Sequence, residues 1–422
     1  MARKMKDSGI EWIGEIPEGW ETINPKALFV QRKDRASKGE RQLTSSQQYG
    51  ILYQDDYMEL TGSKVVTVEK DFDILKHVEA GDFVISMRSF QGGLEYSTKS
   101  GAISSAYVML VPNLELVYPR FYRWLLKSSV YIDALQRTTN MVRDGQAMRY
   151  SNFAQVRLFT LPLDEQKSRA DFLDLECSSI DKILFKTRSS IEEYKKLKQA
   201  VITQAVTKGV RGEREMKDSG VEWIGEIPKE WDILNLVTHT SMLTPMRDRP
   251  ENLDGPIPWI RIEDFDGKYI SSSKASLGVS KETVRSMNLK IYPVGTILCT
   301  SSCIMGKCAI VSRELVSNQR FIGIIPDQNT CENFLYYLML SNSERMNYLA
   351  TGALQANLSR SSFEHLKVQF PSYPEQKEIS DYLDTKCAEI DKLIAKKEQL
   401  VKELESYKKS LIYEVVTGKR EV

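Results

Sequence analysis

One short stretch occurs twice in the chain, and this stretch decides the fold. Residues 5–21 read MKDSGIEWIGEIPEGWE, and residues 216–232 read MKDSGVEWIGEIPKEWD. The two copies agree at 13 of 17 positions and lie 211 residues apart. Agreement of this length does not arise by chance, so the chain contains an internal repeat.

A second repeated stretch closes each copy. LPLDEQKSRADFLDLECSSIDKIL surrounds Glu165, and SYPEQKEISDYLDTKCAEIDKLI surrounds Glu375, 210 residues later. The correspondence runs without a gap to Thr207 and Thr417. The protein is therefore one segment of about 210 residues written twice, a period far longer than that of solenoid repeats. Two copies in one chain predict a pseudo-two-fold axis, as in a homodimer joined end to end.

The composition is that of an ordinary globular protein. Of the 422 residues, 41% are hydrophobic and 27% are charged, which is enough for a real core and for two or three domains. The formal net charge is +1, which excludes a uniformly basic nucleic-acid binder but not a local basic patch.

The sequence gives no export or membrane signal. No apolar run approaches the roughly 18 residues of a membrane helix, and the charged start has no apolar stretch behind it. The 6 cysteines are too sparse for a disulfide framework. We therefore expect a cytoplasmic protein that does not enter a membrane.

The segments between the repeated stretches, 22–160 and 233–370, predict two globules of mixed α/β structure. Short β-type runs are bounded by Gly, Pro and Asn. The predicted strands are Lys64–Val68, Phe83–Ser86, Tyr107–Val111, Trp259–Ile262, Thr296–Cys299 and Phe321–Ile325. A helical stretch then closes each globule, Arg120–Leu135 in the first and Cys331–Ala350 in the second.

A long helix follows each globule, with Glu165 or Glu375 in its first turn and Gly209 or Gly418 as its stop. In the second copy, Ser372 and Glu375 have the spacing of a capping box. Apolar residues recur in alternating steps of three and four, the period of a coiled-coil seam. The seam residues are Leu173, Ile180, Leu184, Ile191, Tyr194, Leu383, Ile390, Ile394, Val401, Leu404 and Leu411.

The seam is interrupted at matching places in the two helices. The interruptions are Thr187 and Lys198 in the first, and Lys397 and Lys408 in the second. Matching stripes predict that the helices pack on each other, and a two-fold axis crossing the pair makes them antiparallel. We therefore expect an α+β protein with two similar α/β globules, separated by two long antiparallel coiled-coil helices and related by a pseudo-two-fold repeat.

These features together resemble the specificity subunit of type I restriction-modification enzymes. The resemblance is carried by Trp12–Trp20 with its copy Trp223–Trp231, and by the helix entries Pro162–Gln166 and Pro374–Gln376. The strand-loop-glycine element at 85–92 and the closing Thr-Lys-Gly and Thr-Gly add to it. It covers essentially the whole chain.

The resemblance implies a division of labour along the chain. Each globule is expected to be a target-recognition domain that reads one half of a split double-stranded DNA site. The helices are expected to set the spacing and to dock two methyltransferase subunits, and endonuclease subunits join the full complex. The implied segments are 1–21 (N-terminal repeat), 22–160 (target-recognition domain 1), 161–215 (spacer helix 1), 216–232 (second repeat), 233–370 (target-recognition domain 2) and 371–422 (spacer helix 2).

The resemblance also implies that this subunit performs no chemistry. It is expected to hold no cofactor and no metal, with S-adenosylmethionine, ATP and Mg²⁺ only on partner subunits. The second loop, 299–306, departs from the first because it has no arginine at the place of Arg88. We therefore expect the two domains to read different half-sites.

The residues themselves offer no catalytic constellation. No Pro-Pro dipeptide occurs for a methyltransferase site, and Gln91-Gly92-Gly93 is too short for a nucleotide loop. The Glu-Gln-Lys triplets at 165 and 375 imitate a nuclease motif but fall in the first turn of a helix. Cysteines 299, 303, 308 and 331 lack zinc-knuckle spacing and are expected to be buried thiols, and the 3 histidines are scattered.

DNA contacts are expected from polar and basic loop residues, which make directed bonds to groove edges. The segment from Tyr118 to Thr160 has a local charge of +5, which suits phosphate neutralisation, although a solvated helix face is the alternative for any one arginine. First-copy candidates are Ser45, Ser46, Gln47, Arg88, Ser89, Gln91, Arg143, Gln146 and Arg149. Second-copy candidates are Arg247, Arg249, Ser302, Lys307, Arg320, Gln355, Asn357 and Arg360.

Two other classes of function stay open at this point. A coiled-coil scaffold without specific DNA recognition is disfavoured, because scaffolding does not need two globules that differ between the copies. An enzyme with an unrecognised active site is disfavoured by the missing cofactor motifs.

Overall fold

The chain forms two compact units. The computed structural model describes residues 3–68, 72–86, 94–138, 149–245, 248–302, 306–350 and 358–422. Unit 1 is Met1–Arg188 together with Gln399–Val422, and unit 2 is Ser189–Glu398. Each unit therefore combines a globule with portions of both long helices. The predicted six-segment division follows the sequence repeat instead, and it stays a prediction.

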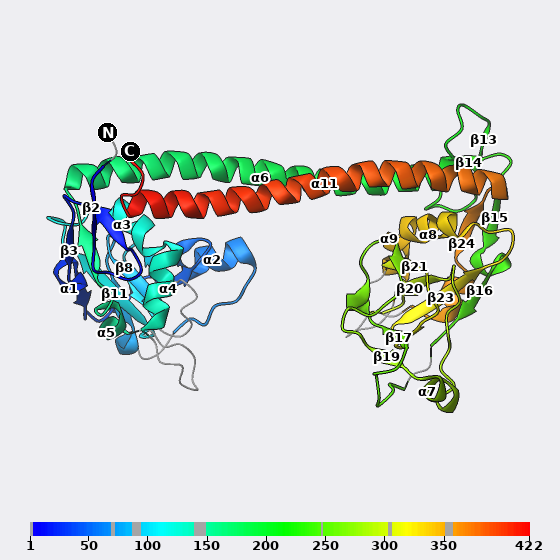
Figure 1. Cartoon of the computed structure of the whole chain (residues 1–422), viewed down its shortest axis with the longest axis horizontal. Helices are drawn as coiled ribbons and strands as arrows, with labels where there is room; N and C mark the ends of the chain where they lie inside the picture. The colour runs from blue at the N-terminus through cyan, green and yellow to red at the C-terminus, as the bar shows by residue number, and fades with distance from the viewer. Residues whose placement is uncertain are drawn as a thin grey trace. The chain divides into compact units, whose positions relative to one another are not determined.

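Two helices are much longer than the rest: α6 spans Leu163–Lys208 and α11 spans Tyr373–Val416 (Figure 1). As expected, each has a glutamate in its first turn. The predicted stops are confirmed, because Gly209 and Gly418 follow the helices with φ of 76° and 77°. This left-handed conformation suits glycine.

Within each unit, the α6 and α11 portions run in opposite directions. In unit 1, Asp181 pairs with Lys408, and further along α6 Arg188 pairs with Glu405. In unit 2, Tyr194 faces Lys397 and Lys198 pairs with Asp391, with the same reversal of order.

Unit 1 is built on a four-stranded antiparallel sheet in the order β4-β11-β8-β9. These strands are β4 (Phe29–Arg32), β11 (Tyr107–Pro112), β8 (Phe83–Ser86) and β9 (Leu94–Tyr96). Antiparallel pairs are β1 (Met5–Asp7) with β2 (Glu15–Pro17), β3 (Glu21–Ile23) with β12 (Leu158–Thr160), β5 (Leu43–Ser46) with β6 (Gly50–Tyr53), and β7 (Lys76–Val78) with β10 (Gly101–Ile103). The short helices are α1 (Pro25–Leu28), α2 (Gln54–Thr61), η1 (Phe72–Ile74), α3 (Pro119–Leu126), α4 (Ser129–Arg137) and α5 (Tyr150–Phe153).

Unit 2 has a five-stranded sheet in the order β16-β23-β20-β21-β18, in which only the β18–β21 pairing is parallel. These strands are β16 (Thr240–Leu243), β23 (Phe321–Pro326), β20 (Ile297–Thr300), β21 (Cys308–Val311) and β18 (Tyr269–Ile270). Smaller sheets join β19 (Gly278–Val279), β17 (Ile257–Ile260) and β22 (Val316–Ser317), then β13 (Met216–Asp218) with β14 (Glu226–Pro228), and β15 (Asp232–Asn235) with β24 (Lys367–Phe370). The short helices are η2 (Leu236–Thr238), η3 (Ile262–Asp264), α7 (Lys281–Ser286), α8 (Glu332–Ser341), α9 (Ser343–Leu349) and α10 (Arg360–Glu364).

Three local predictions were wrong. The predicted helices over 120–135 and 331–350 each break in two, because Ser128 and Asn342 are buried and turn their side chains back to a carbonyl of the preceding helix, that of Leu125 or Leu338. The predicted strand at 64–68 is not a strand. Its Val68 backbone pairs with the side-chain amide of Gln42 instead of a neighbouring strand.

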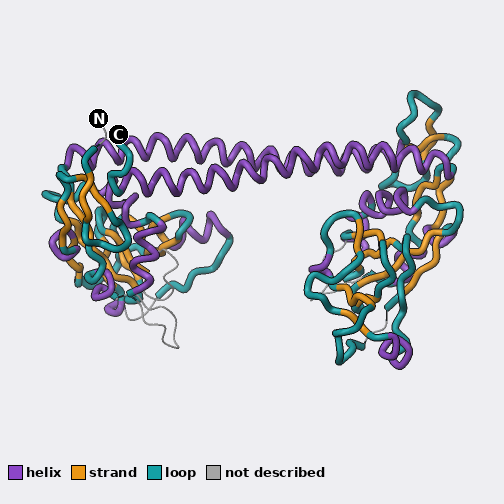
Figure 2. The backbone as a smooth tube through the Cα atoms, viewed as in Figure 1, coloured by secondary structure: helices purple, strands orange, loops and turns teal. Residues whose placement is uncertain are grey.

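The sheets and short helices pack on the long helices in each unit, where strands and loops make up most of the globule (Figure 2). In unit 1 the core joins Phe121 and Leu125 of α3 with Leu173 of α6 and Leu411 of α11. In unit 2 it likewise joins α8 to α6 and α11. No helix in the described ranges is long and apolar enough to cross a bilayer.

Candidate nucleic-acid interface

Several second-copy candidates meet at one end of the unit 2 sheet, where β20 ends and β21 and β23 begin. Backbone hydrogen bonds tie this end together: Thr300 N–H donates to the Lys307 carbonyl at 2.9 Å, and Ser301 N–H donates to the Arg320 carbonyl at 2.8 Å. Leu358 N–H donates to the Ser301 carbonyl at 2.9 Å. The structure therefore brings Ser302, Lys307 and Arg320 close to the chain that leads into α10.

The side chains at this end differ in availability. Lys307, Arg320 and Arg360 are exposed, whereas Ser302 is buried and is therefore a poor base reader. Arg360 pairs with Glu364 one turn along α10, at 2.7 Å. Arg249 is exposed in the loop before β17.

First-copy candidates lie on two separate elements of unit 1. Ser45 and Ser46 end β5 and are half-buried, and Gln47 follows them as an exposed residue in the turn to β6. Arg149 is exposed and precedes α5. The remaining candidates lie outside the described residues: Arg88, Ser89, Gln91, Arg143, Gln146, Arg247, Gln355 and Asn357.

The basic segment from Tyr118 to Thr160 is partly neutralised by acidic residues from elsewhere in unit 1. Arg120 and Arg123 both pair with Asp174 of α6. Lys127 pairs with the buried Glu95 at 2.7 Å. The local charge of +5 counted along the sequence therefore overstates what this segment presents to a phosphate.

Asp174 of α6 holds the globule of unit 1 on the long helix, a contact that the sequence did not predict. We call this contact, and its counterpart at Asp384 in unit 2, the aspartate clamp. Besides pairing with Arg123, Asp174 accepts a hydrogen bond from the Trp124 indole at 2.7 Å. Its counterpart 210 residues later, Asp384, accepts from the Tyr337 hydroxyl at 2.6 Å and pairs with Lys268 at 2.5 Å. The repeat offset could have identified both aspartates, but not their partners.

A buried glutamine in the first turn of each long helix holds the globule by its backbone. Gln166 accepts from Tyr118 N–H at 2.7 Å, and its amide donates to the Leu116 carbonyl at 2.8 Å. Gln376 accepts from Cys331 N–H at 2.8 Å and donates to the Asn329 carbonyl at 3.1 Å. Both glutamines are almost inaccessible to solvent, so the Glu-Gln pair of the repeated motif has a structural explanation.

The neighbouring glutamate ties the repeated tryptophan to the helix. In unit 1 the buried Trp20 indole donates to Glu165 at 3.1 Å, and Arg3 donates to the same carboxylate at 2.5 Å. In unit 2 the buried Trp231 indole donates to Glu375 at 3.0 Å, and Arg214 donates at 2.6 Å. We call each such cluster a joint. The Glu375 carboxylate thus takes part in this joint, and the predicted capping box stays a prediction.

The first joint carries a second arginine. Arg169 donates to Glu165 at 2.7 Å and to the Val415 carbonyl at 2.8 Å, at the C-terminal end of α11. Burial raises the pKa of Glu165, but hydrogen bonds from Arg3, Arg169 and Trp20 outweigh it and lower that pKa to about 2. The carboxylate is therefore held in its charged form.

The two joints cap the opposing helix by different side chains. Arg169 corresponds to Ile379 in the second copy, which cannot donate a hydrogen bond. There the task passes to Gln369, whose amide donates to the Val206 carbonyl of α6 at 2.7 Å. Gln369 corresponds in turn to Phe159, which stacks on Trp20 with ring centroids 5.0 Å apart. In each unit, therefore, one side chain donates a hydrogen bond to a carbonyl near the C-terminal end of the opposing helix. The last carbonyls of a helix need such donors because they have no partner within the helix.

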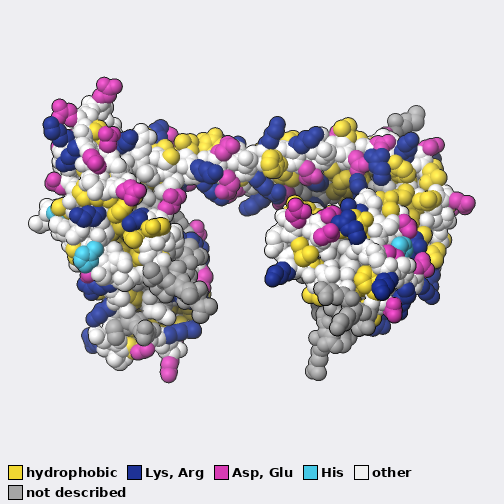
Figure 3. Space-filling model, turned by 180° about the vertical axis from the view of Figure 1, so that it is seen from behind, with side chains coloured by type: hydrophobic (Ala, Val, Ile, Leu, Met, Phe, Trp, Pro, Cys, Tyr) yellow, Lys and Arg dark blue, Asp and Glu magenta, His cyan; other side chains and the backbone are white. Residues whose placement is uncertain are grey.

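Two of the three lysines that interrupt the predicted seam form matching ion pairs. Lys408 pairs with Asp181 at 2.6 Å in unit 1, and Lys198 pairs with Asp391 at 2.6 Å in unit 2. Each lysine and each aspartate has its counterpart 210 residues away. Figure 3 shows basic and acidic side chains interspersed along the helices.

The predicted seam residues are buried to different degrees. The buried ones are Leu173, Ile180, Leu184, Ile191, Leu383, Ile390 and Leu411. The half-buried ones are Tyr194, Ile394, Val401 and Leu404.

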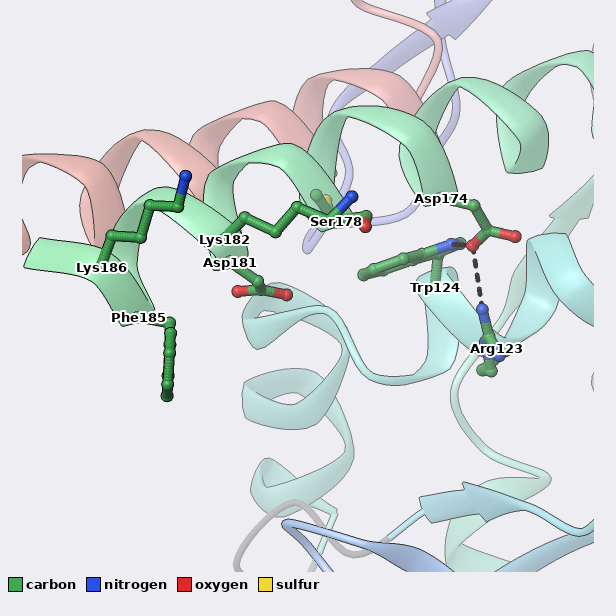
Figure 4. Close-up of a pocket in the computed structure, with 9 residues that line it drawn as sticks. Arg123, Trp124, Asp174, Ser178, Asp181, Lys182, Phe185 and Lys186 are labelled. Atoms are coloured by element: carbon green, nitrogen blue, oxygen red, sulfur yellow. Dashed lines mark hydrogen bonds and ion pairs between the residues drawn. The ribbon is translucent and has the colours of Figure 1, made fainter. Parts of the chain in front are cut away.

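A surface hollow of about 640 Å³ lies in unit 1 between α3 and α6 (Figure 4). Arg123 and Trp124 of α3 converge there on Asp174 of α6, while Phe185 projects at the other end with 75% of its surface exposed. Among the described residues, no group of three His, Cys, Asp or Glu side chains is placed to hold a metal ion.

Comparison with known proteins points to one family. The sequence model of the "Type I restriction modification DNA specificity domain" matches residues 232–403. The chain is 32% identical to the type I restriction enzyme MjaIX specificity subunit of Methanocaldococcus jannaschii, in an alignment that covers 41% of each protein. It is 23% identical to the MjaVIII specificity subunit of the same organism, over 96% of this chain and 93% of the relative.

The fold has a solved counterpart. A chain in the structure described as "Structural basis underlying complex assembly and conformational transition of the type I R-M system" matches with a TM-score of 0.74 and 12% identity. The match covers 96% of this chain and 99% of that one. The expected mixed α/β fold with a long helix is confirmed, whereas the coiled-coil packing and the pseudo-two-fold relation stay predictions.

Proposed function

The chain belongs to the type I restriction-modification specificity subunits and is a DNA-recognition subunit, and we propose that each of its two globules reads one half of a bipartite DNA site. The relatives support this function over that of a scaffold without DNA recognition. In this proposal the recognition residues lie on the loops of the two globules, and the long helices carry the globules.

The observation that carries the proposal is the contrast between constant joints and variable loops. Both copies retain the tryptophan-glutamate-arginine contact, the buried glutamine and the aspartate clamp. Between them, the segments 22–160 and 233–370 differ in sequence and in sheet size. The parts that hold each globule on the helices are the same in both copies, whereas the loops differ. This arrangement suits two globules that recognise different DNA sequences, because contacts to bases specify a site whereas the scaffold only positions those contacts.

Among the described residues, those best suited to bind DNA have exposed, positively charged side chains. They are Lys307, Arg320, Arg360 and Arg149. All are long cations on loops or at element ends, and such residues bind phosphates or guanine edges. We propose that they contact double-stranded DNA, together with the candidates outside the described residues.

We further propose that the subunit is not catalytic and works in the cytoplasm with partners. Two methyltransferase subunits would dock on the helices, endonuclease subunits would join them, and S-adenosylmethionine, ATP and Mg²⁺ would bind only to those partners. Leu175, Ile183 and Phe185 of α6 support a docking function, because all three expose large apolar side chains.

Domain exchange tests the reading of half-sites. Residues 233–370 are replaced by the corresponding segment of a relative with a different methylated motif, but Gln369 is retained. The second joint then keeps Trp231, Arg214 and Glu375 together with its donor to the Val206 carbonyl. The variant is expressed with the methyltransferase subunits, and the methylated motif is read by sequencing the host genome. We expect only one half of the motif to change.

The reciprocal exchange of residues 22–160 is the matched control and should change only the other half. If both halves change, or if neither does while methylation persists, then the globules do not read separate half-sites.

A further inference from the structure

Two cysteines of unit 2 face each other across neighbouring strands. Cys299 is the last but one residue of β20, and Cys308 is the first residue of β21. Their sulfur atoms are 2.8 Å apart, and both side chains are buried, Cys299 completely and Cys308 with 6% of its surface exposed. Both are free thiols.

The strand register suits a covalent link between them. Cys299 and Cys308 are direct partners in the antiparallel pairing. The next pair, Thr300 with Lys307, is joined by a backbone hydrogen bond, so the cysteines occupy a non-hydrogen-bonded position. Cα atoms at such positions lie about 4.5 Å apart, within the usual range for a disulfide. The sulfur atoms need to approach by less than about 1 Å to reach bonding distance.

Packing alone does not require thiols at this place. In unit 1 the matching strands β8 and β9 pair Ile85 with Leu94, 214 residues before Cys299 and Cys308. Both aliphatic side chains are fully buried. The same position is therefore filled by hydrocarbon in one copy and by two thiols in the other.

We propose that Cys299 and Cys308 are an oxidation-sensitive dithiol that a hydroperoxide converts to a disulfide between β20 and β21. The Cys308 thiol, the more exposed of the two, loses its proton and its sulfur attacks one peroxide oxygen. The S–O bond of a sulfenic acid forms as the O–O bond breaks, and the leaving hydroxide takes up the thiol proton and departs as water. The Cys299 thiol then loses its proton as its sulfur attacks the Cys308 sulfur; the S–S bond forms as the S–O bond breaks, and the leaving hydroxide takes up that proton and departs as a second water. Two thiols give up two electrons, and one hydrogen peroxide becomes two waters.

The disulfide fixes the end of β20 to the start of β21. Lys307 directly precedes Cys308, and two residues after Cys299 the Ser301 backbone donates to the Arg320 carbonyl and accepts from Leu358 N–H. On the proposed function, on which this consequence rests, oxidation alters the reading of one half-site only. Unit 1 has no thiols at the equivalent pair and is an internal reference.

The chemical test uses the full chain and no DNA. The protein is treated with hydrogen peroxide, blocked with N-ethylmaleimide in denaturant, digested and analysed by mass spectrometry. We expect the maleimide count to fall from 6 to 4, a peptide pair linked through Cys299 and Cys308, and reversal by dithiothreitol. Unlinked Cys299 and Cys308 at peroxide doses that oxidise other thiols of the chain would overturn the proposal.

The matched control carries the residues of the first copy, Cys299→Ile with Cys308→Leu. It should keep its other 4 thiols under the same treatment. A second arm measures binding of the reduced and oxidised complexes to DNA with each half-site altered in turn. Selective DNA binding by the reduced complex tests the proposed function itself. If the disulfide forms but binding to both half-sites is unchanged, the redox site stands and its effect on recognition is refuted.

Discussion

Removing the charge of Glu165 should weaken the first joint and change how its stability depends on pH. The Glu165→Gln side chain keeps an oxygen for the Trp20 indole, but it no longer neutralises Arg3 and Arg169. Arg169 is 2% exposed, so its charge would stay buried with less compensation.

The size of the effect follows from the pKa of Glu165. The folded-state pKa is about 2, against an ordinary glutamate value of about 4.3, and each unit corresponds to about 1.36 kcal/mol. The upper limit is therefore about 3 kcal/mol at neutral pH. Because 23% of the side chain is exposed, solvent screening lowers the expected loss to about 2 kcal/mol.

The sign of the pH dependence is fixed by the direction of the shift. The folded-state pKa is lowered, so the charged carboxylate stabilises unit 1 fully above the unfolded pKa of about 4.3. This stabilisation is lost as the pH falls towards 2. The variant lacks it at every pH and should show a flatter profile through this range.

Hydrogen exchange read by mass spectrometry provides a local assay. Peptides from 5–21 and from the start of α6 report on the first joint, and peptides from 216–232 report on the second joint in the same sample. We expect faster exchange only in the first set. The matched control is Asp164→Asn, which removes an exposed carboxylate from the same helical turn. If Asp164→Asn reproduces the effect, or if Glu165→Gln retains the wild-type pH profile, the joint argument is wrong.

Two further predictions concern a histidine and the helix length. Burial lowers the pKa of His77, but hydrogen bonds with Glu40 and Glu79 outweigh burial and raise that pKa. Protonated His77 therefore stabilises β7 fully below about pH 6.5, and this stabilisation is lost as the pH rises through the pKa of His77 in the folded protein. His77→Gln should therefore remove the difference in β7 hydrogen exchange between pH 6 and pH 8, and an undiminished difference would contradict this. Four residues inserted after both Ser190 and Leu400, equivalent positions in the two copies, lengthen each helix by about 6 Å, so the methylated motif should keep its half-sites and gain one or two base pairs of gap at roughly 3.4 Å each. An unchanged gap would show that the helices do not set the spacing.

The sequence predicts well where a local pattern controls the outcome. The helices α6 and α11 follow from apolar periodicity, and Gly209 and Gly418 end them because glycine adopts positive φ without strain. Turn residues and β-branched runs likewise located β8, β11, β20 and β23. The repeat itself identified the positions that matter in both copies.

Local patterns failed where a side chain far along the chain supplied the partner. Nothing near Ser128 or Asn342 distinguishes one long helix from two short ones until burial makes their side chains bond to the preceding turn. The arginines of 118–160 appear free in sequence, yet Asp174 of α6 takes two of them.

The sequence by itself determined that this protein is a duplicated chain with two long helices, the same joint residues in both copies, and different loops between them. Periodic burial and backbone preference are local properties, and a one-dimensional pattern records them. Only the tertiary structure decided what those residues bind. In the structure, Glu165 accepts a hydrogen bond from Trp20, 145 residues away. The donor to the end of the opposing helix is Arg169 in unit 1 and Gln369 in unit 2. Such partners are selected by the geometry of packing, which brings donors to buried acceptors regardless of their separation in the chain.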